Sequence, residues 1–264
     1  MVKNLFILSL LALVTSCKTN TIYLESKFIP GKEYLETTII ITEKADTAIG
    51  LSSNYVKPNI NRDTLVAKSL IKTGVKKVNK FPISYSELNI METKYSVDQI
   101  SYGWVNENGI VDLDSIMVRY FDPDESWKNE ELEFNESILN TRLPFSGKLS
   151  VGDTVKIKSF RDFYIGSDTY FFELEMDEIL KLIQIKDGIA YFDIQYDFSL
   201  SPVDSKYDRR ISYMGKGKAE FDIKNSIITK YIKDMLIDYT YKYNGKLYES
   251  YSKKYYQETI EIKN

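Results

Sequence analysis

The chain has 264 residues, with 35 basic and 38 acidic side chains, and its net formal charge is −3. Nucleic-acid binding is not expected, because proteins that bind nucleic acid carry basic surfaces. Histidine is absent, which excludes Ser-His-Asp and Cys-His catalysis and imidazole metal sites. One cysteine, Cys17, excludes an internal disulfide, and no Walker loop or dinucleotide-binding fingerprint occurs.

The first residues are arranged like an export signal. Lys3 supplies one positive charge, an apolar run interrupted only by Ser9 extends from Leu5 to Val14, and small residues follow. A charged start, an apolar stretch and small residues before a cleavage site are typical of a secretory signal. The apolar run is too short to cross a bilayer, which takes about 20 residues.

The end of this signal resembles the lipobox of bacterial lipoproteins. Val14-Thr15-Ser16-Cys17 has a branched apolar residue, two small residues and then the cysteine. The resemblance implies cleavage after residue 16, acylation of Cys17 with fatty acids such as palmitate, and a polar tether over residues 17–30. Several acyl chains on one residue anchor a protein stably. The alternative is an ordinary export signal whose cleavage site includes a cysteine.

The residues after Cys17 bear on the destination. Lys18 follows the cysteine, whereas Asp at this position retains lipoproteins in the inner membrane, so the resemblance implies an outer-membrane anchor. Surface-exported lipoproteins of Bacteroidetes type often carry acidic residues immediately after the cysteine. The first acid here is Glu25, so we expect the protein to face the periplasm.

Residues 31–264 are expected to form a single β-rich domain. The chain has 21 tyrosines and 13 phenylalanines, and aromatic and β-branched residues favour strands. The predicted fold is mainly β: a large curved antiparallel sheet or half-barrel with one or two short helices. The first predicted strand is Tyr34–Thr42, and a short helix is possible within Thr64–Val75.

The middle of the chain contains a predicted hairpin and a predicted helix. Ser101–Val105 and Ile110–Leu113 flank a turn that ends in Asn-Gly, a strong hairpin signal. Asp124–Asn140 has acidic residues in its first turn and ends before a proline, which is typical of a helix. The segment Pro144–Ser150 is the best internal boundary, and we expect a loop within one sheet.

Strands follow at Val151–Phe160 and Thr169–Met176, and then a hairpin turns at Asp187-Gly188, although a short helix from Leu180 is an alternative. A two-residue turn predicts cross-strand pairs that share a mostly apolar face. These pairs are Ile185 with Ala190, Ile183 with Phe192, and Lys181 with Ile194. One apolar face and one mixed face indicate an antiparallel sheet that is covered on one side.

The last predicted elements are a strand at Gly217–Ile223 and a hairpin that turns at Asn244-Gly245. Gly215 and Gly217, at the start of that strand, are interpreted as a bulge. The final hairpin pairs Tyr243 with Lys246, Tyr241 with Tyr248, and Tyr239 with Ser250. One face of the hairpin is therefore nearly a ladder of tyrosines.

A second resemblance concerns the mature domain. The segment Gly147–Val155 is similar to a Val-Gly-Asp-Thr-Trp-like segment of uncharacterised β-rich lipoproteins, with Val155 in place of the tryptophan. In architecture the domain resembles the Lol-type lipoprotein carriers. This resemblance implies a curved sheet or half-barrel that holds a hydrophobic ligand, and it assigns no ligand residues.

Catalytic motifs are weak. Ser69-Leu70-Ile71-Lys72 and Lys72-Thr73-Gly74 match two motifs of penicillin-binding proteins, but the matches share one lysine that the family needs at two separate places. The middle of the chain also has a group of five acidic residues, and we expect them to form a solvated surface rather than a cation site. They are Asp112, Asp114, Asp122, Asp124 and Glu125. A glycosidase-type carboxylate pair assembled from distant strands stays open.

We therefore expect a non-catalytic, membrane-anchored lipoprotein that binds a hydrophobic ligand or an envelope protein partner on its sheet. No cofactor and no metal are expected. The alternative is an aromatic platform for a glycan or peptide, with Tyr239, Tyr241, Tyr243 and Tyr248 as candidate contacts, because tyrosine has a flat apolar face and a polar tip. A hydrolase that uses carboxylates is a third possibility.

Overall fold

A computed structural model describes residues 21–49, 59–90, 99–118, 124–140, 146–165, 170–200, 210–243 and 246–263. The predicted signal peptide and Cys17 lie outside these ranges. The described residues form thirteen strands and one helix, α2 (Glu125–Asn140). The prediction of a mainly β fold, with a large curved antiparallel sheet and a short helix, is confirmed. No helix in these ranges is both long enough and apolar enough to span a bilayer.

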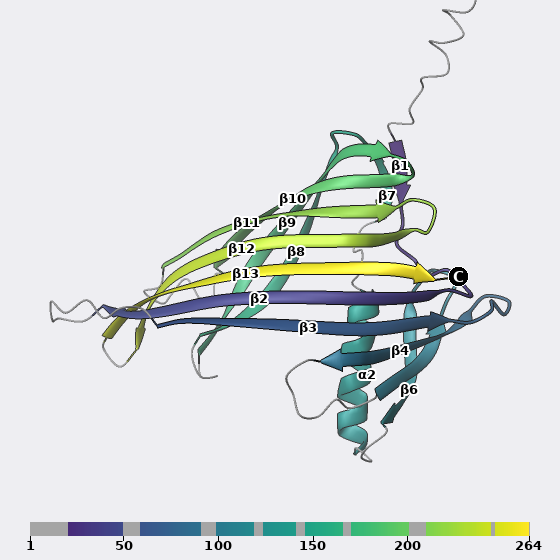
Figure 1. Ribbon diagram of the computed structural model, residues 1–264, viewed down its shortest axis with the longest axis horizontal. Helices are drawn as coiled ribbons and strands as arrows, with labels where there is room; N and C mark the ends of the chain where they lie inside the picture. Colours follow the sequence, from purple (N-terminus) through teal and green to yellow (C-terminus); the bar gives the residue numbers. More distant parts are fainter. Residues whose placement is uncertain are drawn as a thin grey trace, which may run out of the picture.

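Eleven strands form one antiparallel sheet that runs from β6 at one edge to β8 at the other. In spatial order they are β6 (Val111–Val118), β5 (Gln99–Val105), β4 (Phe81–Ile90), β3 (Asn59–Thr73), β2 (Glu33–Ile49), β13 (Lys246–Lys263), β12 (Ile227–Tyr243), β11 (Arg210–Asp222), β10 (Ile189–Leu200), β9 (Tyr170–Lys186) and β8 (Thr154–Ile165). Figure 1 shows the long central strands side by side, with β8 and β9 turning behind them.

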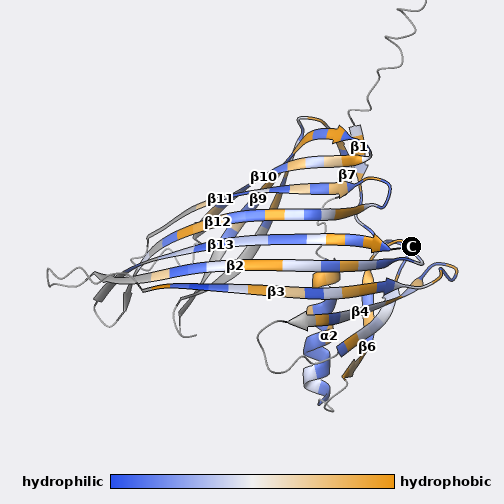
Figure 2. Cartoon of the chain, viewed as in Figure 1, coloured by the Kyte–Doolittle hydropathy of each residue, from blue (hydrophilic) through white to orange (hydrophobic). Residues whose placement is uncertain are grey.

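The sheet consists of two meanders that meet in its middle. Strands β2 to β6 pair in chain order, and so do β8 to β13. The last strand, β13, then pairs with β2 from Leu247 with Ile49 to Lys263 with Glu33. This long pairing joins the two halves of the chain into one sheet. Figure 2 shows both polar and apolar stretches along the long strands of the sheet.

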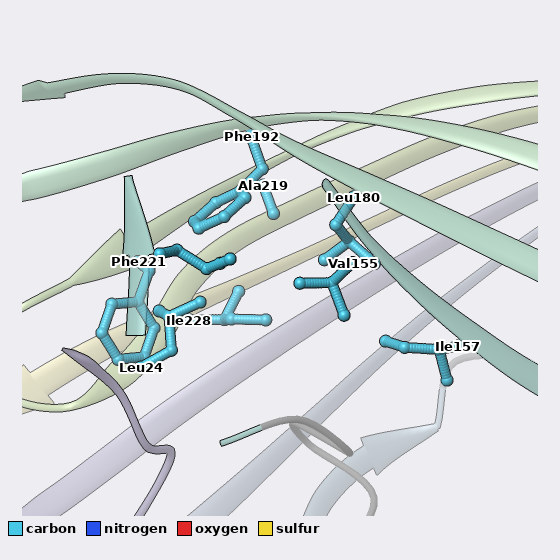
Figure 3. Close-up of a pocket in the computed structure, with 9 residues that line it drawn as sticks. Leu24, Val155, Ile157, Leu180, Phe192, Ala219, Phe221 and Ile228 are labelled. Carbon is cyan, nitrogen blue, oxygen red and sulfur yellow. The ribbon is translucent and has the colours of Figure 1, made fainter. Parts of the chain in front are cut away.

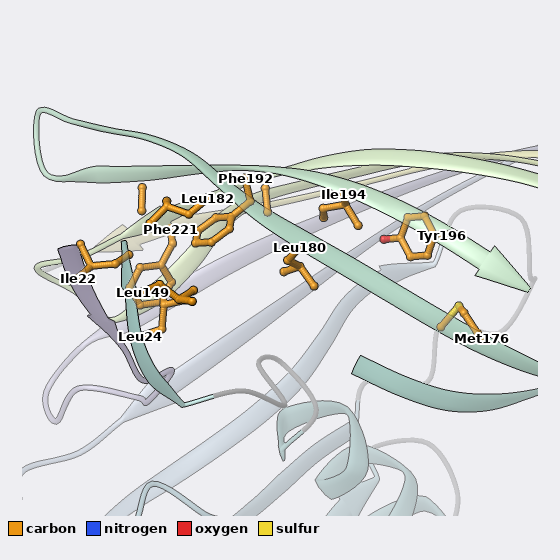
Figure 4. Packing of buried hydrophobic residues seen from close by; sticks show 12 residues of the cluster. Ile22, Leu24, Leu149, Met176, Leu180, Leu182, Phe192, Ile194, Tyr196 and Phe221 are labelled. Atoms are coloured by element: carbon orange, nitrogen blue, oxygen red, sulfur yellow. The ribbon is translucent and has the colours of Figure 1, made fainter. Parts of the chain in front are cut away.

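One face of the sheet, here called the covered face, packs against the remaining elements. The helix α2 buries Leu139 against β2 to β6 in one apolar cluster, together with Tyr34, Ile71 and Val111. Strands β1 (Thr21–Leu24) and β7 (Gly147–Ser150) pair with each other and pack across β9 to β12 in a second cluster. Figure 4 shows this second cluster between the short strands and the main sheet.

The predicted helix at Asp124–Asn140 is confirmed, beginning one residue later. Asp124 lies at its N-cap, where Oδ1 accepts a hydrogen bond of 2.8 Å from the backbone N–H of Trp127. At the other end, the Asn140 side chain accepts from the N–H of Val111 at 2.8 Å and donates to its carbonyl at 2.9 Å. The cap and this two-way bond fix α2 against β6.

The short strands correct two expectations. Residues 21–24 were expected in the polar tether of residues 17–30, but they form β1. Ile22 and Leu24 are buried on one side of this strand, and Tyr23 between them is exposed on the other. The expected loop at Pro144–Ser150 is wrong for Gly147–Ser150, which form β7. The pairing of β1 with β7 is antiparallel and joins residues more than a hundred positions apart, so neither segment carries a local signal for it.

Three local predictions were also wrong. The possible helix within Thr64–Val75 is instead most of β3, because this segment pairs with β2 on one side and β4 on the other. The alternative helix from Leu180 is part of β9. The strand expected from Val151 begins only at Thr154, since Gly152 has a φ of 99° in a turn before it.

The register of the hairpin at Asp187-Gly188 differs from the prediction. Ile185 is opposite Ala190 as expected, but a bulge between Tyr191 and Phe192 shifts all later pairs by one residue. Phe192 is therefore opposite Leu182 rather than Ile183. The shift buries Leu182 completely and leaves Ile183 41 % exposed. It also places Leu180, rather than the predicted Lys181, opposite Ile194, which keeps a lysine out of the core.

Candidate ligand-binding site

An apolar cavity lies between the short strands and the main sheet. The empty space there amounts to about 370 Å³ when the adjoining open solvent is counted, so the enclosed part is much smaller. All nine of its lining residues, most of which are labelled in Figure 3, are apolar: Leu24, Leu149, Val155, Ile157, Leu180, Phe192, Ala219, Phe221 and Ile228.

The strand register explains why these side chains meet. Directly opposite residues of neighbouring strands lie on the same face of a sheet. Val155 is opposite Leu180 and Phe192 is opposite Ala219, so β8 to β11 contribute to one wall. Ala219 has the smallest side chain of the set, and its methyl group leaves space that a larger residue would fill. Strands β1 and β7 supply the facing wall through Leu24 and Leu149.

A group of polar side chains, here called the tyrosine cluster, lies at one end of this cavity and consists of Glu178, Tyr196, Tyr231, Lys233 and Tyr256. The hydroxyl of Tyr231 donates to Glu178 Oε1 at 2.7 Å, and that of Tyr196 donates to the same oxygen at 3.3 Å. The two hydroxyls also contact each other directly. Glu178 thus accepts two hydrogen bonds from tyrosines on two different strands.

The cluster touches the cavity wall at two points. Glu178 is opposite Ile157 in the β8–β9 pairing, and Tyr231 is opposite Ala219 in the β11–β12 pairing. Ile157 and Ala219 both line the cavity. Tyr231 also packs against the apolar cluster that contains Tyr196. The apolar space therefore ends where hydroxyl and carboxylate groups begin.

Burial changes the titration of the tyrosines. The pKa of Tyr231 is raised far above its ordinary value, first by burial and then by the neighbouring Tyr196 and Glu178. Burial, followed by the charge of Glu258, likewise raises the pKa of Tyr256. The Tyr256 hydroxyl donates to Glu258 Oε2 at 2.6 Å. Both hydroxyls are therefore protonated hydrogen-bond donors throughout the physiological pH range.

Two glycines of β11 lie between the strands that carry Tyr196 and Tyr231. Tyr196 is on β10 and Tyr231 on β12, so β11 runs between them. On the covered face of β11, Gly215 is opposite Tyr196 and Gly217 is opposite Lys233. A Cβ atom at Gly217 would clash with the carbonyl oxygen of Ile232. The expected bulge at these glycines is wrong, because the irregularity of the β11–β12 pairing lies between Glu220 and Phe221.

Lys233 lies among the aromatic rings of the cluster. Its ammonium nitrogen is 4.8 Å from the ring centre of Tyr256, 5.7 Å from that of Tyr231 and 5.9 Å from that of Tyr196. An ammonium group at such distances is attracted to the ring faces. The half-buried Lys233 thus brings a positive charge to the polar end of the cavity.

A second polar group lies under α2. Ser69 Oγ donates to Glu36 Oε2 at 2.7 Å, and Ser69 is opposite Glu87. The pKa of Glu87 is raised, first by burial and then by the charge of Glu131 on α2. Asn135 on α2 is fully buried, and its Oδ1 accepts no hydrogen bond. Within the described ranges, no three His, Cys, Asp or Glu residues gather as a metal site would require.

The structure separates the residues of the Ser-x-x-Lys match. Ser69 and Lys72 are three positions apart on β3, so their side chains are on opposite faces of the sheet. Ser69 is buried on the covered face, whereas the Lys72 ammonium pairs with Glu33 at 2.8 Å. This serine and this lysine therefore cannot act together. The solvated surface expected for Asp112, Asp114, Asp124 and Glu125 is confirmed, and Asp122 lies outside the described residues.

The predicted tyrosine ladder is confirmed at the level of the backbone. Tyr241 is opposite Tyr248, Tyr239 is opposite Ser250, and Tyr243 is opposite Lys246. The side chains of the four candidate tyrosines, like Cys17, lie outside the described residues. Sequence reasoning missed the tyrosine cluster, since its members come from four strands. Gly215-Lys216-Gly217 was the available signal, because two glycines on one face of a strand leave room for large neighbours.

No protein-family model matches this chain, and no curated protein matches it. Among solved structures, the outer membrane protein OprG from Pseudomonas aeruginosa is 5 % identical, with a TM-score of 0.25 over 90 % of this chain and 99 % of that one. The Salmonella type III secretion secretin InvG is 8 % identical, with a TM-score of 0.16 over 97 % of this chain and 64 % of the secretin chain. Similarity at this level supports no argument about function.

Proposed function

We propose that the mature protein is a lipid-anchored, periplasm-facing lipoprotein of the outer membrane that binds a hydrophobic ligand in the apolar cavity. The observation that carries the proposal is the cavity itself, which nine apolar residues line and which a small set of polar groups borders. Pockets that bind small molecules have this composition, in which apolar walls supply affinity and a few polar groups fix orientation. Apolar surface that a ligand covers contributes about 25 cal/mol per Å².

A binding role without catalysis fits the residue types near the cavity. The chain has no histidine, and its one cysteine is the proposed site of acylation. Glu178 accepts hydrogen bonds from the hydroxyls of Tyr196 and Tyr231, and the raised pKa of Tyr231 keeps that hydroxyl protonated, so the group is arranged as a fixed hydrogen-bond network rather than as an acid and a base. The proposal of a non-catalytic protein rests on these residues.

The ligand is tested by native mass spectrometry of mature protein purified in mild detergent. The wild type should carry a co-purifying apolar molecule, and Ala219→Leu, which fills the cavity, should not. Ala67→Leu is the matched control, since Ala67 is half-buried on β3, away from the cavity. A clean mass for the wild type, together with no binding of added fatty acid, would exclude the proposed ligand site.

The anchor has a separate test. Cys17→Ser should abolish labelling by a fatty-acid analogue and release the protein from the membrane into the soluble fraction, because the thiol that carries the acyl group is gone. Ser16→Ala, which keeps a small residue before the cysteine, serves as the control and should remain membrane-bound. If the Cys17→Ser protein stays with the membrane, the proposed lipid anchor is wrong.

The aromatic platform for a glycan or peptide is the second candidate, and the confirmed register of Tyr241 opposite Tyr248 favours it. A row of tyrosines on a strand pair can stack on sugar rings. Binding on a glycan array that disappears in Tyr241→Ala and Tyr248→Ala would support this function. Binding that survives both substitutions would exclude it.

A further inference from the structure

The turn between β3 and β4, residues 75–80, is here called the basic tip and carries exposed apolar side chains. Val78 is 90 % exposed and Val75 is 77 % exposed. The segment has no acid, and its three lysines, all exposed, are Lys76, Lys77 and Lys80. Exposed apolar residues that stand together among polar ones mark surfaces that bind a membrane or a protein.

The backbone of the basic tip holds Val78 in an unfavourable conformation. Its φ is 54°, in the left-handed region that branched residues rarely adopt. The N–H of Lys77 donates to the carbonyl of Lys80 at 2.7 Å, and the N–H of Lys80 donates back at 3.1 Å. In a two-residue hairpin turn, glycine is favoured where the first central residue has a positive φ. Turn geometry therefore does not account for a valine there, and strained residues of this kind gather at binding sites.

The charge of the basic tip is positive and uncompensated. Among the residues that the structure describes, no ion pair or hydrogen bond holds the ammonium group of Lys76 or Lys77. The ammonium group of Lys80 is 4.2 Å from the ring centre of Trp104, a contact that leaves its charge in place. On the neighbouring strand β2, Glu33 already pairs with a lysine of β3 at 2.8 Å.

The basic tip shares one end of the sheet with several other turns. Because the pairings are antiparallel, the same end carries the β5–β6, β9–β10 and β11–β12 turns and the C-terminal end of β13. The acids nearby belong to those other elements, with Glu107 in the β5–β6 turn, Asp112 on β6 and Asp187 in the β9–β10 turn. The positive charge is thus concentrated at the tip.

The chain enters the sheet from its N-terminus at this same end. Thr21, the first residue of β1, is opposite Ser150, the last residue of β7. The turn that follows β7 is bonded to β9 near the β9–β10 turn, since the N–H of Gly152 donates to the carbonyl of Leu182 at 2.7 Å. Figure 1 shows the start of β1 and the C-terminus at the same end of the long strands. Cys17 is four residues before Thr21, and four residues span at most about 14 Å.

We infer that the basic tip is a second contact of the protein with its membrane. Val75 and Val78 enter the interfacial region of the bilayer, and Lys76 and Lys77 bind the phosphates of anionic phospholipids. Burial of the valines and attraction of the lysines to an anionic surface both favour this contact. Two contacts fix the orientation of the sheet relative to the membrane, which one acylated residue alone does not. The inference goes beyond the proposed function, and its test uses protein without an acyl group.

Binding is measured by sedimentation of the mature Cys17→Ser chain with two kinds of vesicle. One contains phosphatidylglycerol and phosphatidylethanolamine, and the other contains only phosphatidylcholine. Each lysine near an anionic surface contributes about fivefold, so the chain should favour the anionic vesicles about twentyfold at low salt. Lys76→Gln combined with Lys77→Gln should remove most of this preference. Lys216→Gln combined with Lys218→Gln changes the net charge equally at exposed positions of β11 and is the matched control.

Insertion of the apolar residues is followed separately. Cys17→Ser leaves the chain without cysteine, so Val78→Cys can carry a single environment-sensitive fluorophore. Its emission should shift to shorter wavelength when anionic vesicles are added. Met214→Cys, at a 73 % exposed position within β11, should show no shift. Val78→Asn, which tolerates a positive φ, should keep the free energy of unfolding at least at the wild-type value and weaken vesicle binding about tenfold.

Four outcomes overturn the inference. They are equal binding to both kinds of vesicle, a preference that survives Lys76→Gln with Lys77→Gln, an unchanged emission at position 78, and binding to soluble dextran sulfate without binding to vesicles. The last result would assign the tip to a polyanionic partner instead of a membrane. These outcomes leave the ligand cavity and the acylation of Cys17 untouched, because both have their own tests.

Discussion

The substitution Ala219→Leu tests whether the cavity is real space. Ala219 is 3 % exposed, lines the cavity, and stands between Phe192 and Tyr231 in the sheet. Leucine adds three carbon atoms. At about 0.8 kcal/mol for each buried methylene, a side chain that fits would raise the free energy of unfolding by about 2 kcal/mol. In a core that is already filled, the same change would lower it by about 1–3 kcal/mol.

The assay combines urea unfolding, followed by circular dichroism, with binding of a fluorescent fatty-acid analogue. We expect Ala219→Leu to keep or raise the unfolding midpoint with an unchanged slope, and to lose binding. Ala67→Leu should bind as the wild type does. A loss of stability together with retained binding would show that the space at Ala219 is closed core and that the ligand, if any, binds elsewhere.

Four further substitutions test other parts of the structure. Tyr231→Phe removes the 2.7 Å hydrogen bond to Glu178 and should lower the free energy of unfolding by about 1–3 kcal/mol in urea titrations, whereas an unchanged value would mean that the bond contributes nothing. Glu87 has a raised pKa in the folded protein, so its contribution to stability is fully present below its ordinary value of 4.5 and is lost as the pH rises through the raised pKa. Glu87→Gln should therefore stabilise the protein at pH 7 but not at pH 4, and equal effects at both pH values would contradict the assigned cause. Because the bulge in the β9–β10 hairpin buries Leu182 and exposes Ile183, Leu182→Ala should lower the free energy of unfolding by about 2–5 kcal/mol, while Ile183→Ala should change it little. A larger loss for Ile183→Ala than for Leu182→Ala would mean that the hairpin pairs without a bulge.

Local patterns in the sequence predicted much of the sheet. The Asn-Gly and Asp-Gly turns, with alternating polar and apolar residues on both sides, predicted the hairpins. The acidic residues in the first turn of α2 predicted the helix. The class of fold followed, because many strands that alternate in polarity must cover one face. These signals are local, and each is complete within about twenty residues.

Long-range pairing was not predictable from such signals. The pairing of β2 with β13 joins the two ends of the domain, and that of β1 with β7 joins Ile22 to Leu149. The alternation of polar and apolar residues along a strand indicates which of its faces is buried, but not which strand lies beside it. The bulge at Tyr191 was missed for a related reason: the cost of burying Lys181 becomes visible only once the opposite strand and the cavity are in place.

The residues of the candidate sites likewise fall into two groups, those that a local signal predicted and those that only long-range pairing brings together. Tyr241 and Tyr248 were found because they belong to one hairpin, whose register the turn fixes. Tyr196 and Tyr231 meet across an intervening strand, which carries Gly215 and Gly217. Two strand pairings had to be known before these residues could be placed together.

The most direct test of the proposed ligand site is an isotope-filtered nuclear Overhauser experiment on mature protein with labelled Ala, Leu and Ile methyl groups and unlabelled laurate. If the ligand lies in the cavity, the chain protons of laurate should show contacts to the methyl groups of Ala219, Leu180 and Ile228, which line it. Contacts confined to methyl groups of the opposite face, such as that of Ile39, or no contacts at a saturating concentration, would contradict it.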